Sequence, residues 1–200
     1  MEHIVIDNTV LVSGFNFNLV YDKDDDNEDA EVDKNGKNGK IGENALQVYT
    51  TPEILTEAEN NYQSSRIITV ALAQNQLMVQ SPSTQSIKEI KKHATKSGDL
   101  GALSNPDLSI LGLAFELKNL YPNDHVILYS DDYSVQNTAA FLNIDSKSLQ
   151  NEGIQTQIVW QVYCPQCFRN HASSKLGKEC DFCGGILKRK RKRRSSPRKN

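Results

Sequence analysis

The stretch VILYSDDYSVQNTAAFL (residues 126–142) places a short apolar run directly before two aspartates and a helical pattern. An uninterrupted apolar run is typical of a strand buried in a parallel sheet, and Val135–Leu142 is predicted to form the helix that follows it. The earlier stretch HIVID (residues 3–7) also ends an apolar run in an acid. Strands that alternate with helices predict an α/β fold with a mainly parallel sheet.

Further helices are predicted between these two strands. The sequence TTPE (residues 50–53) combines a capping threonine, a first-turn proline and an acid, which is a helix start signal, and SNPD (residues 104–107) has the same form. Residues 84–97 show helical periodicity and end at Gly98. The run IITVAL (residues 67–72) fits either a strand or a buried helix segment. We expect these helices to flank the sheet.

Four acids follow these elements in an order that suggests a common site. Asp7 and Asp132 each come after an apolar strand, and the carboxyl ends of parallel strands line the ligand crevice of open α/β sheets. Glu57 lies one helical turn after Glu53, and Asp107 lies in the first turn of its predicted helix. Converging carboxylates repel one another unless a divalent cation balances them, and oxygen ligands suit Mg²⁺ or Mn²⁺.

Each acid also has a structural explanation. Asp107 could complete a capping box, although it shares a helix face with apolar residues that face the core. Glu53 is expected to cap its helix, and Glu57 could be a solvated helix residue. Asp131 and Asp132 could be turn residues. Asp7 is the hardest to explain structurally, because a buried strand rarely ends in an acid.

Two Cys-x-x-Cys pairs predict a zinc site. Cys164 and Cys167 form the first pair, Cys180 and Cys183 the second, with 12 residues between them. Such pairs present thiolates for tetrahedral coordination of one zinc ion, and in a reducing compartment they indicate metal rather than disulfide. The alternative is a redox dithiol. Because all four ligands are thiolates, the zinc is expected to be structural, and His171 in the loop between the pairs is not needed as a ligand.

The charge distribution is uneven. Residues 188–200 hold nine Lys or Arg and no acid, whereas residues 1–187 hold 14 basic and 25 acidic residues. The tail fits RNA phosphate binding without sequence readout, or alternatively a solubility tail or a localisation-like run. Phe168 fits either RNA contact or a small core around zinc. The candidate RNA-binding residues are Arg169, Lys175, Lys178, Lys188, Arg189, Lys190 and Arg191.

Residues 22–42 are acidic at first and then rich in Gly, Asn and Lys, so we expect a disordered insertion. The sequence has no apolar run of 18 residues, which argues against a transmembrane helix, and its first residues lack the pattern of a signal peptide. We therefore expect a cytoplasmic protein.

Together these stretches resemble a known family. The segments VIDNTVLVSGF (5–15), VYTTPEILTEAEN (48–60), KSGDLGALSNPDLSILGLAFEL (96–117) and LYSDDYSVQNTAAFLNI (128–144) are similar to PIN-domain ribonucleases of the archaeal-like Nob-one type. The resemblance implies a PIN-like domain over residues 1–152, a zinc ribbon over 158–187 and a basic disordered tail over 188–200.

The resemblance also implies which residues act. The metal-binding and catalytic acids of the family fall on Asp7, Glu57, Asp107 and Asp132, and Asp131 is a further candidate ligand. Asp131 and Asp99 are candidates for positions behind the ligands, and Thr9 matches a hydroxyl residue of the family. The implied cofactors are one structural zinc ion and one or two catalytic Mg²⁺ or Mn²⁺ ions.

The function implied is endonucleolytic hydrolysis of precursor small-subunit (16S-type) rRNA at its 3′ end during ribosome maturation. The implied partners are this RNA, the pre-ribosomal particle and, as a candidate, a KH-domain assembly factor. Two alternatives are a PIN ribonuclease with another RNA target and a catalytically silent RNA-binding assembly module.

Overall fold

The computed structural model describes residues 1–17, 46–150 and 152–192. The expected insertion at residues 22–42 and residues 193–200 of the expected tail lie outside this part of the chain. Within it, no helix is long and apolar enough to cross a membrane.

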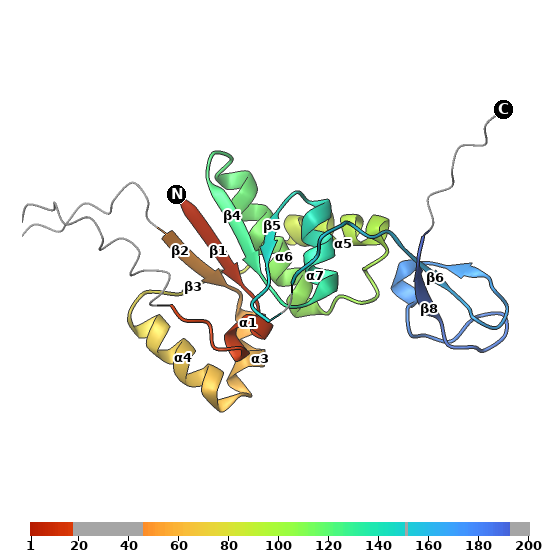
Figure 1. Cartoon of the computed structure of the whole chain (residues 1–200), viewed down its shortest axis with the longest axis horizontal. Helices are drawn as coiled ribbons and strands as arrows, with labels where there is room; N and C mark the ends of the chain where they lie inside the picture. The colour runs from red at the N-terminus through yellow and green to blue at the C-terminus, as the bar shows by residue number, and fades with distance from the viewer. Residues whose placement is uncertain (18–45, 151, 193–200) are drawn as a thin grey trace, which may run out of the picture.

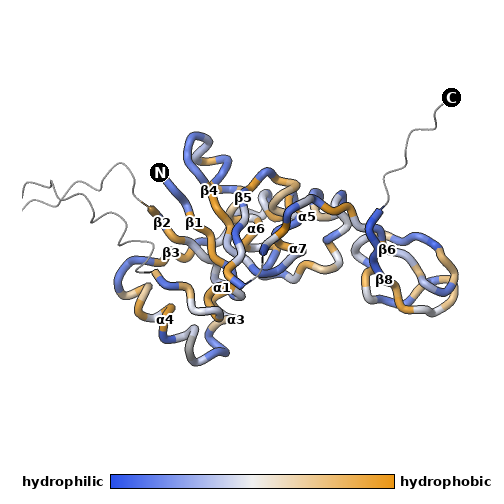
Figure 2. Tube along the Cα trace, viewed as in Figure 1, coloured by the Kyte–Doolittle hydropathy of each residue, from blue (hydrophilic) through white to orange (hydrophobic). Residues whose placement is uncertain are grey.

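A five-stranded parallel sheet forms the centre of the larger part, as predicted. Its order is β3-β2-β1-β4-β5. The central strand β1 pairs Ile4 with Val48 on one side and with Ile127 on the other. Both neighbours are apolar because helices cover the sheet, and Figure 2 shows hydrophobic residues along these strands. The strands are β1 (Glu2–Ile6), β2 (Leu46–Thr50), β3 (Met78–Val79), β4 (His125–Tyr129) and β5 (Asp145–Lys147).

In the described part of the chain six helices accompany the sheet, with α3 and α4 below it in Figure 1 and α5 to α7 on the side of the C-terminal part. The predicted caps are confirmed: Thr51 caps α3, Ser104 caps α6, and Gly98 ends α5 with a positive φ of 87°. The ambiguous run at residues 67–72 lies in α4, a helix. The helices are α1 (Asn8–Val12), α3 (Pro52–Glu59), α4 (Tyr62–Ala73), α5 (Thr84–Ser97), α6 (Asn105–Leu120) and α7 (Tyr133–Phe141).

Helix α6 runs through the core. Its residues Leu108–Ala114 are all buried, and Leu117 is buried one turn later. A helix that is apolar around most of its circumference is stable only when it is enclosed. It contacts β1, β4, α3, α5 and α7. Because its N-terminal turn is therefore fixed, the acid in that turn, Asp107, is also fixed relative to the sheet.

A separate three-stranded antiparallel sheet, here called the ribbon (residues 160–192), follows with the order β7-β6-β8. Its small core contains Val162, Cys164, Cys180 and Leu187. The strands are β6 (Trp160–Tyr163), β7 (Asn170–His171) and β8 (Lys188–Arg191). The expected boundary at residue 187 is wrong, since residues 188–191 of the expected disordered tail pair with β6. Three of the four basic residues of β8 are exposed and only Arg189 is partly buried, so a basic run is compatible with this strand.

The ribbon contacts the larger part at the end of α5. A Cβ atom at Gly98 would overlap the carbonyl oxygen of Trp160, so only glycine permits this approach. Asn137 of α7 also fixes the connecting chain, because its side chain bonds both the N–H and the C=O of Ile158 at 2.8 Å. The two hydrophobic cores are separate, but their surfaces are joined.

Candidate active site and metal centre

Asp7 lies at the carboxyl end of β1, where it caps α1, and only 3% of it is exposed. Its Oδ1 accepts a hydrogen bond from the Asn8 amide at 2.7 Å. Its Oδ2 accepts from the hydroxyl groups of Ser130 at 2.7 Å and Thr9 at 3.1 Å. These bonds fix the carboxylate at the edge of the sheet, which agrees with the sequence-based expectation that a buried acid here has a purpose.

The charge of Asp7 is held in an unfavourable environment. Burial raises its pKa from the ordinary value of 3.8 to about 6; the hydrogen bond from Ser130 lowers the pKa and the nearby carboxylate of Asp107 raises it. The carboxylate of Asp107 is therefore one of the charges that act on Asp7. A shifted carboxyl beside a second acid is typical of functional sites.

Asp132 lies at the carboxyl end of the neighbouring strand β4 and caps α7. Its Oδ1 accepts from the amides of Ser134 and Val135. Its own amide donates to the Ser130 hydroxyl at 3.1 Å. Ser130, which the sequence analysis did not single out, thus links Asp7 and Asp132. A serine between an apolar strand and two acids was its only signal in the sequence.

Glu57 and Asp107 complete the set from α3 and α6. The exposed Glu57 accepts a long bond of 3.4 Å from the Asn8 side chain, next to Asp7. Asp107 forms a capping box with Ser104, with bonds of 2.8 and 3.3 Å. The capping explanation of Asp107 is therefore correct.

Three other acids have structural partners. Glu53, expected to cap α3, lies in its first turn, and its carboxylate accepts from the Ser109 hydroxyl of α6 at 2.8 Å. The Oδ1 of Asp131 accepts from the amides of Leu149 and Gln150, both at 3.0 Å, and so holds the chain after β5. Asp99, at the end of α5, is fully buried and bonded within the fold. In none of these contacts is the partner Asp7 or a residue bonded to the Asp7 carboxylate.

The four candidate acids therefore come from four elements that meet at one edge of the sheet. Within the described residues, no three of them bring carboxylate oxygens within 4.8 Å of one another. The donor set consists of oxygen atoms, and the repulsion between Asp7 and Asp107 would be relieved by a cation. These properties fit a hard divalent ion such as Mg²⁺ or Mn²⁺.

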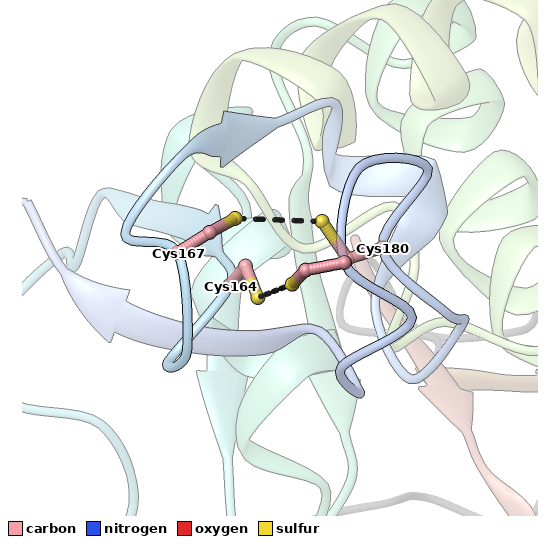
Figure 3. A group of neighbouring side chains, drawn as sticks. Cys164, Cys167 and Cys180 are labelled. Carbon is pink, nitrogen blue, oxygen red and sulfur yellow. Dashed lines mark hydrogen bonds between the residues drawn. The ribbon is translucent and has the colours of Figure 1, made fainter.

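The four cysteines converge much more closely. Their sulfur atoms all lie within 4.8 Å of one another, and Figure 3 shows three of them, Cys164, Cys167 and Cys180, pointing toward one another between the ribbon loops. The Cys164–Cys183 and Cys167–Cys180 Sγ–Sγ distances are 3.4 and 3.6 Å. Sulfurs about 2.3 Å from a tetrahedral zinc ion are about 3.8 Å apart, so the set fits zinc.

The surroundings of Cys164 and Cys180 lower the pKa of their thiols, whereas, despite a bond from the Gly185 amide, neighbouring sulfurs and burial raise the pKa of Cys183 to about 12. The backbone amide of Cys167, and also that of Gln166, lower the pKa of Cys164 to about 6. His171 Nε2 lies 3.4 Å from the sulfur of Cys180. It is placed to hydrogen-bond a thiolate, as residues behind metal ligands commonly do, in agreement with the expectation that it is not needed as a ligand.

The candidate RNA-binding side chains separate into two groups. Arg169 stacks at 3.8 Å over Phe182, which is 65% exposed, and Lys190 lies 4.3 Å from the centre of the Tyr163 ring. Phe168 is 74% exposed, so its interpretation as a core residue is wrong. Arg189 differs from the others because its side chain faces the larger part of the molecule rather than solvent.

Comparison with known proteins places these features in a family. A family model described as the PIN domain of ribonuclease matches residues 35–117. An endoribonuclease Nob1 of Methanothermobacter thermautotrophicus is 32% identical over 78% of this chain and 88% of its own length. One from Pyrococcus abyssi is 34% identical over 72% and 83%. Ribonuclease VapC1 of Thermoplasma acidophilum is 32% identical over 60% and 57%.

Proposed function

Because the chain belongs to the Nob1 endoribonuclease family, we propose that it hydrolyses a phosphodiester bond of precursor small-subunit rRNA at its 3′ end during ribosome maturation. The observation that carries this proposal is the position of Asp7. It is buried, bonded by Ser130 to the Asp132 loop and repelled by Asp107. Asp7 caps α1, and its burial near a second carboxylate also suits it to hold a cation.

The acids Asp7, Glu57, Asp107 and Asp132 would hold one or two Mg²⁺ or Mn²⁺ ions. A bound ion would supply an activated water and neutralise charge on the phosphate. The hydroxyls of Ser130 and Thr9 orient the carboxylate of Asp7, and the α7 amides orient that of Asp132. The folded chain therefore sets these two carboxylates in place before any RNA binds, which lowers the reorganisation needed for hydrolysis.

We assign the nuclease domain to residues 1–152 and the zinc ribbon to residues 158–192, with a structural zinc ion on the four cysteines. Arg169, Lys175, Lys178, Lys188, Lys190 and Arg191 on the ribbon, together with the tail, would contact RNA phosphates. The cation–aromatic pairs of Arg169 and Lys190 support this assignment, because such pairs also stack on unpaired bases. The pre-ribosomal particle, with a KH-domain factor as a candidate member, is the proposed setting.

The test is cleavage of a labelled precursor RNA that spans the 3′ end of small-subunit rRNA, in Mn²⁺ or Mg²⁺, with the product ends mapped. We expect one cleavage site, loss of cleavage in EDTA and no cleavage by Asp7→Asn. Equal cleavage of unrelated RNA would favour a PIN ribonuclease with another target, which the similarity to VapC1 makes the second candidate. Cleavage that persists in EDTA would rule out the metal-dependent mechanism.

A further inference from the structure

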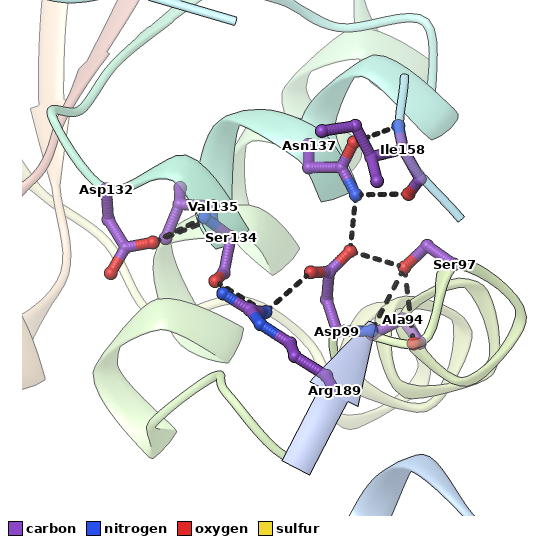
Figure 4. Close-up of polar contacts among 9 residues, drawn as sticks. All are labelled: Ala94, Ser97, Asp99, Asp132, Ser134, Val135, Asn137, Ile158 and Arg189. Atoms are coloured by element: carbon purple, nitrogen blue, oxygen red, sulfur yellow. Dashed lines mark hydrogen bonds and ion pairs between the residues drawn. The ribbon is translucent and has the colours of Figure 1, made fainter. Parts of the chain in front are cut away.

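One ion pair joins the ribbon to the nuclease domain. Nη1 of Arg189, on β8, lies 3.2 Å from Oδ1 of Asp99, at the end of α5 (Figure 4). The Asp99 side chain is fully buried, and that of Arg189 is 29% exposed. A buried carboxylate destabilises a fold strongly unless it is paired and hydrogen-bonded. Asp99 therefore depends on a charge that the ribbon supplies.

The remaining contacts of this pair are all within the junction. Asp99 Oδ2 accepts from the Ser97 hydroxyl at 2.8 Å and the Asn137 amide at 2.6 Å. The guanidinium of Arg189 also donates to the Ser134 hydroxyl at 3.3 Å and lies 4.6 Å from the centre of the Trp160 ring. Both carboxylate oxygens and the flat face of the guanidinium are thus in use, which is the geometry that distinguishes arginine from lysine.

The strand geometry of β8 singles out Arg189 among the basic residues. Side chains alternate between the two faces of a strand. Lys188 and Lys190 are exposed, whereas Arg189, between them, is half-buried. Of these three, Arg189 is the one that contacts Asp99 and α7, although the sequence alone gives no reason to separate it from its neighbours.

The junction reaches the candidate active site through the first turn of α7. Ser134, which Arg189 contacts, donates its amide to the carboxylate of Asp132. Asp99 also interacts electrostatically with Asp132. Burial raises the pKa of Asp99, the hydrogen bonds from Asn137 and Ser97 and the charge of Arg189 lower it, and Asp132 raises it. Without Arg189, the buried Asp99 carboxylate would lose its cationic partner, and Ser134 would lose its bond to the guanidinium.

We propose that Arg189 is a positioning residue: through Asp99 and Ser134 the ribbon fixes the α7 turn that carries Asp132, so that the fold of the cysteine site is coupled to RNA cleavage. This inference rests on the proposed nuclease function. The ribbon then has a second role beside RNA contact, because its strand β8 completes the support of the active site. Loss of the ribbon fold would lower the cleavage rate even on an RNA too short to reach its basic surface.

The test compares Arg189→Gln with Lys190→Gln, which removes the same charge from the opposite face of the same strand. Cleavage of a precursor RNA long enough to reach the basic surface of the ribbon is measured as kcat and KM. We expect Arg189→Gln to lower kcat about 10- to 100-fold, the usual loss when the partner behind a metal ligand is removed. We expect Lys190→Gln to raise KM with little change in kcat. Arg189→Lys should recover part of the lost kcat, since it restores the charge but not the planar fork.

A second readout does not depend on cleavage. Trp160 is the one tryptophan of the chain, and the Arg189 guanidinium covers its ring. We expect its fluorescence emission to shift to longer wavelength in Arg189→Gln and to stay unchanged in Lys190→Gln. The double variant Asp99→Asn/Arg189→Gln, which leaves no unpaired buried charge, should cleave faster than Arg189→Gln alone. Its emission should stay shifted, because the guanidinium that covers Trp160 is still absent.

The outcomes separate the two proposals. If the wild-type protein cleaves and Arg189→Gln has the kcat of the wild type, or changes KM alone as Lys190→Gln does, the positioning role is overturned and Arg189 is one more phosphate contact. The single variant Asp99→Asn is measured as well. If the loss in kcat of the double variant equals the product of the losses in Asp99→Asn and Arg189→Gln, the effect of Arg189 does not pass through Asp99 and this inference fails. If the wild-type protein cleaves no precursor RNA, the proposed function fails, and an unshifted Trp160 emission in Arg189→Gln would then overturn the ribbon contact as well.

Discussion

The cysteine site and the acid site differ in how their ligands are brought together. The four cysteines lie between residues 164 and 183, and their sulfurs are within 4.8 Å of one another. The four acids lie between residues 7 and 132, on four elements, and do not approach one another as closely. The cysteine site is formed by two tight loops close in sequence. The acid site is formed by side chains from the carboxyl ends of β1 and β4 and from the helices α3 and α6.

This difference determines what each site does for the fold. The ribbon has four residues in its buried hydrophobic core, two of which are cysteines, so we expect its stability to depend on a metal bound by the cysteines. The nuclease domain has a large core around β1, β4 and α6, so it folds without help from its acids. The buried charge of Asp7 instead lowers the free energy of unfolding of this domain, as the raised pKa of Asp7 indicates.

The strongest test of the comparison is removal of zinc. We expect one zinc ion per chain, released by thiol modification. Cys180→Ser should unfold the ribbon, because structural zinc in small modules contributes about 10–16 kcal/mol of folding free energy. The nuclease domain should remain folded, with faster hydrogen exchange at the Asp99 junction. A protein with no zinc and with disulfides between the cysteines would contradict this prediction.

The matching test at the acid site is Asp7→Asn, which should leave the fold intact and remove cleavage. The loss in kcat should be at least about 10²–10³-fold, as for removal of one electrostatic stabiliser of a transition state. Glu57→Gln, Asp107→Asn and Asp132→Asn should behave alike, and two together should add little because the acids act as a unit. Glu53→Gln and Asp131→Asn are the controls, and we expect them to retain more activity. Full activity of Asp7→Asn would show that the sheet edge is not the active site.

Stability against pH sharpens the comparison further. Because the folded protein binds the Asp7 proton more tightly than the unfolded chain, the free energy of unfolding should fall as pH rises from about 4 to about 6 and then level off. In EDTA and above pH 6, Asp7→Asn should be more stable than wild type by up to about 3 kcal/mol. Thermal unfolding of the wild type and of Asp7→Asn between about pH 4 and about pH 7 measures this difference in stability. If the stabilities of the wild type and of Asp7→Asn change with pH in the same way, the pKa of Asp7 is not raised in the folded protein.

The smallest expected effect concerns the tail next to the ribbon. Deletion of residues 193–200 removes four basic residues and leaves β8 intact. RNA binding should weaken similarly for all sequences, and the slope of log K against log salt should become shallower by up to about 3, at about 0.7 per phosphate contact on single strands. The cleavage position should not move. Unchanged binding at every salt concentration would assign the tail another role.

Several helix ends and one strand of the fold could be predicted from local sequence. The caps at Thr51 and Ser104, the α5 terminus at Gly98 and the strand before Asp132 all depend on neighbouring residues, and the structure contains each of them. The run at residues 67–72 could not be assigned, because six apolar-rich residues suit a buried helix as well as a strand. The exposed Phe168 was equally ambiguous for a composition-based argument.

The sequence by itself determined the two strands that end at Asp7 and Asp132, the caps of α3 and α6, and the cysteine pairs. These are short-range features, since capping, periodicity and metal-ligand spacing act over a few residues. Only the tertiary structure decided that Ser130 joins Asp7 to Asp132, and that Arg189, one of nine basic residues at the end of the chain, pairs with Asp99. The physical reason is that a buried charge is satisfied by whichever partner the packing brings to it, and here that partner lies 90 positions away in the sequence.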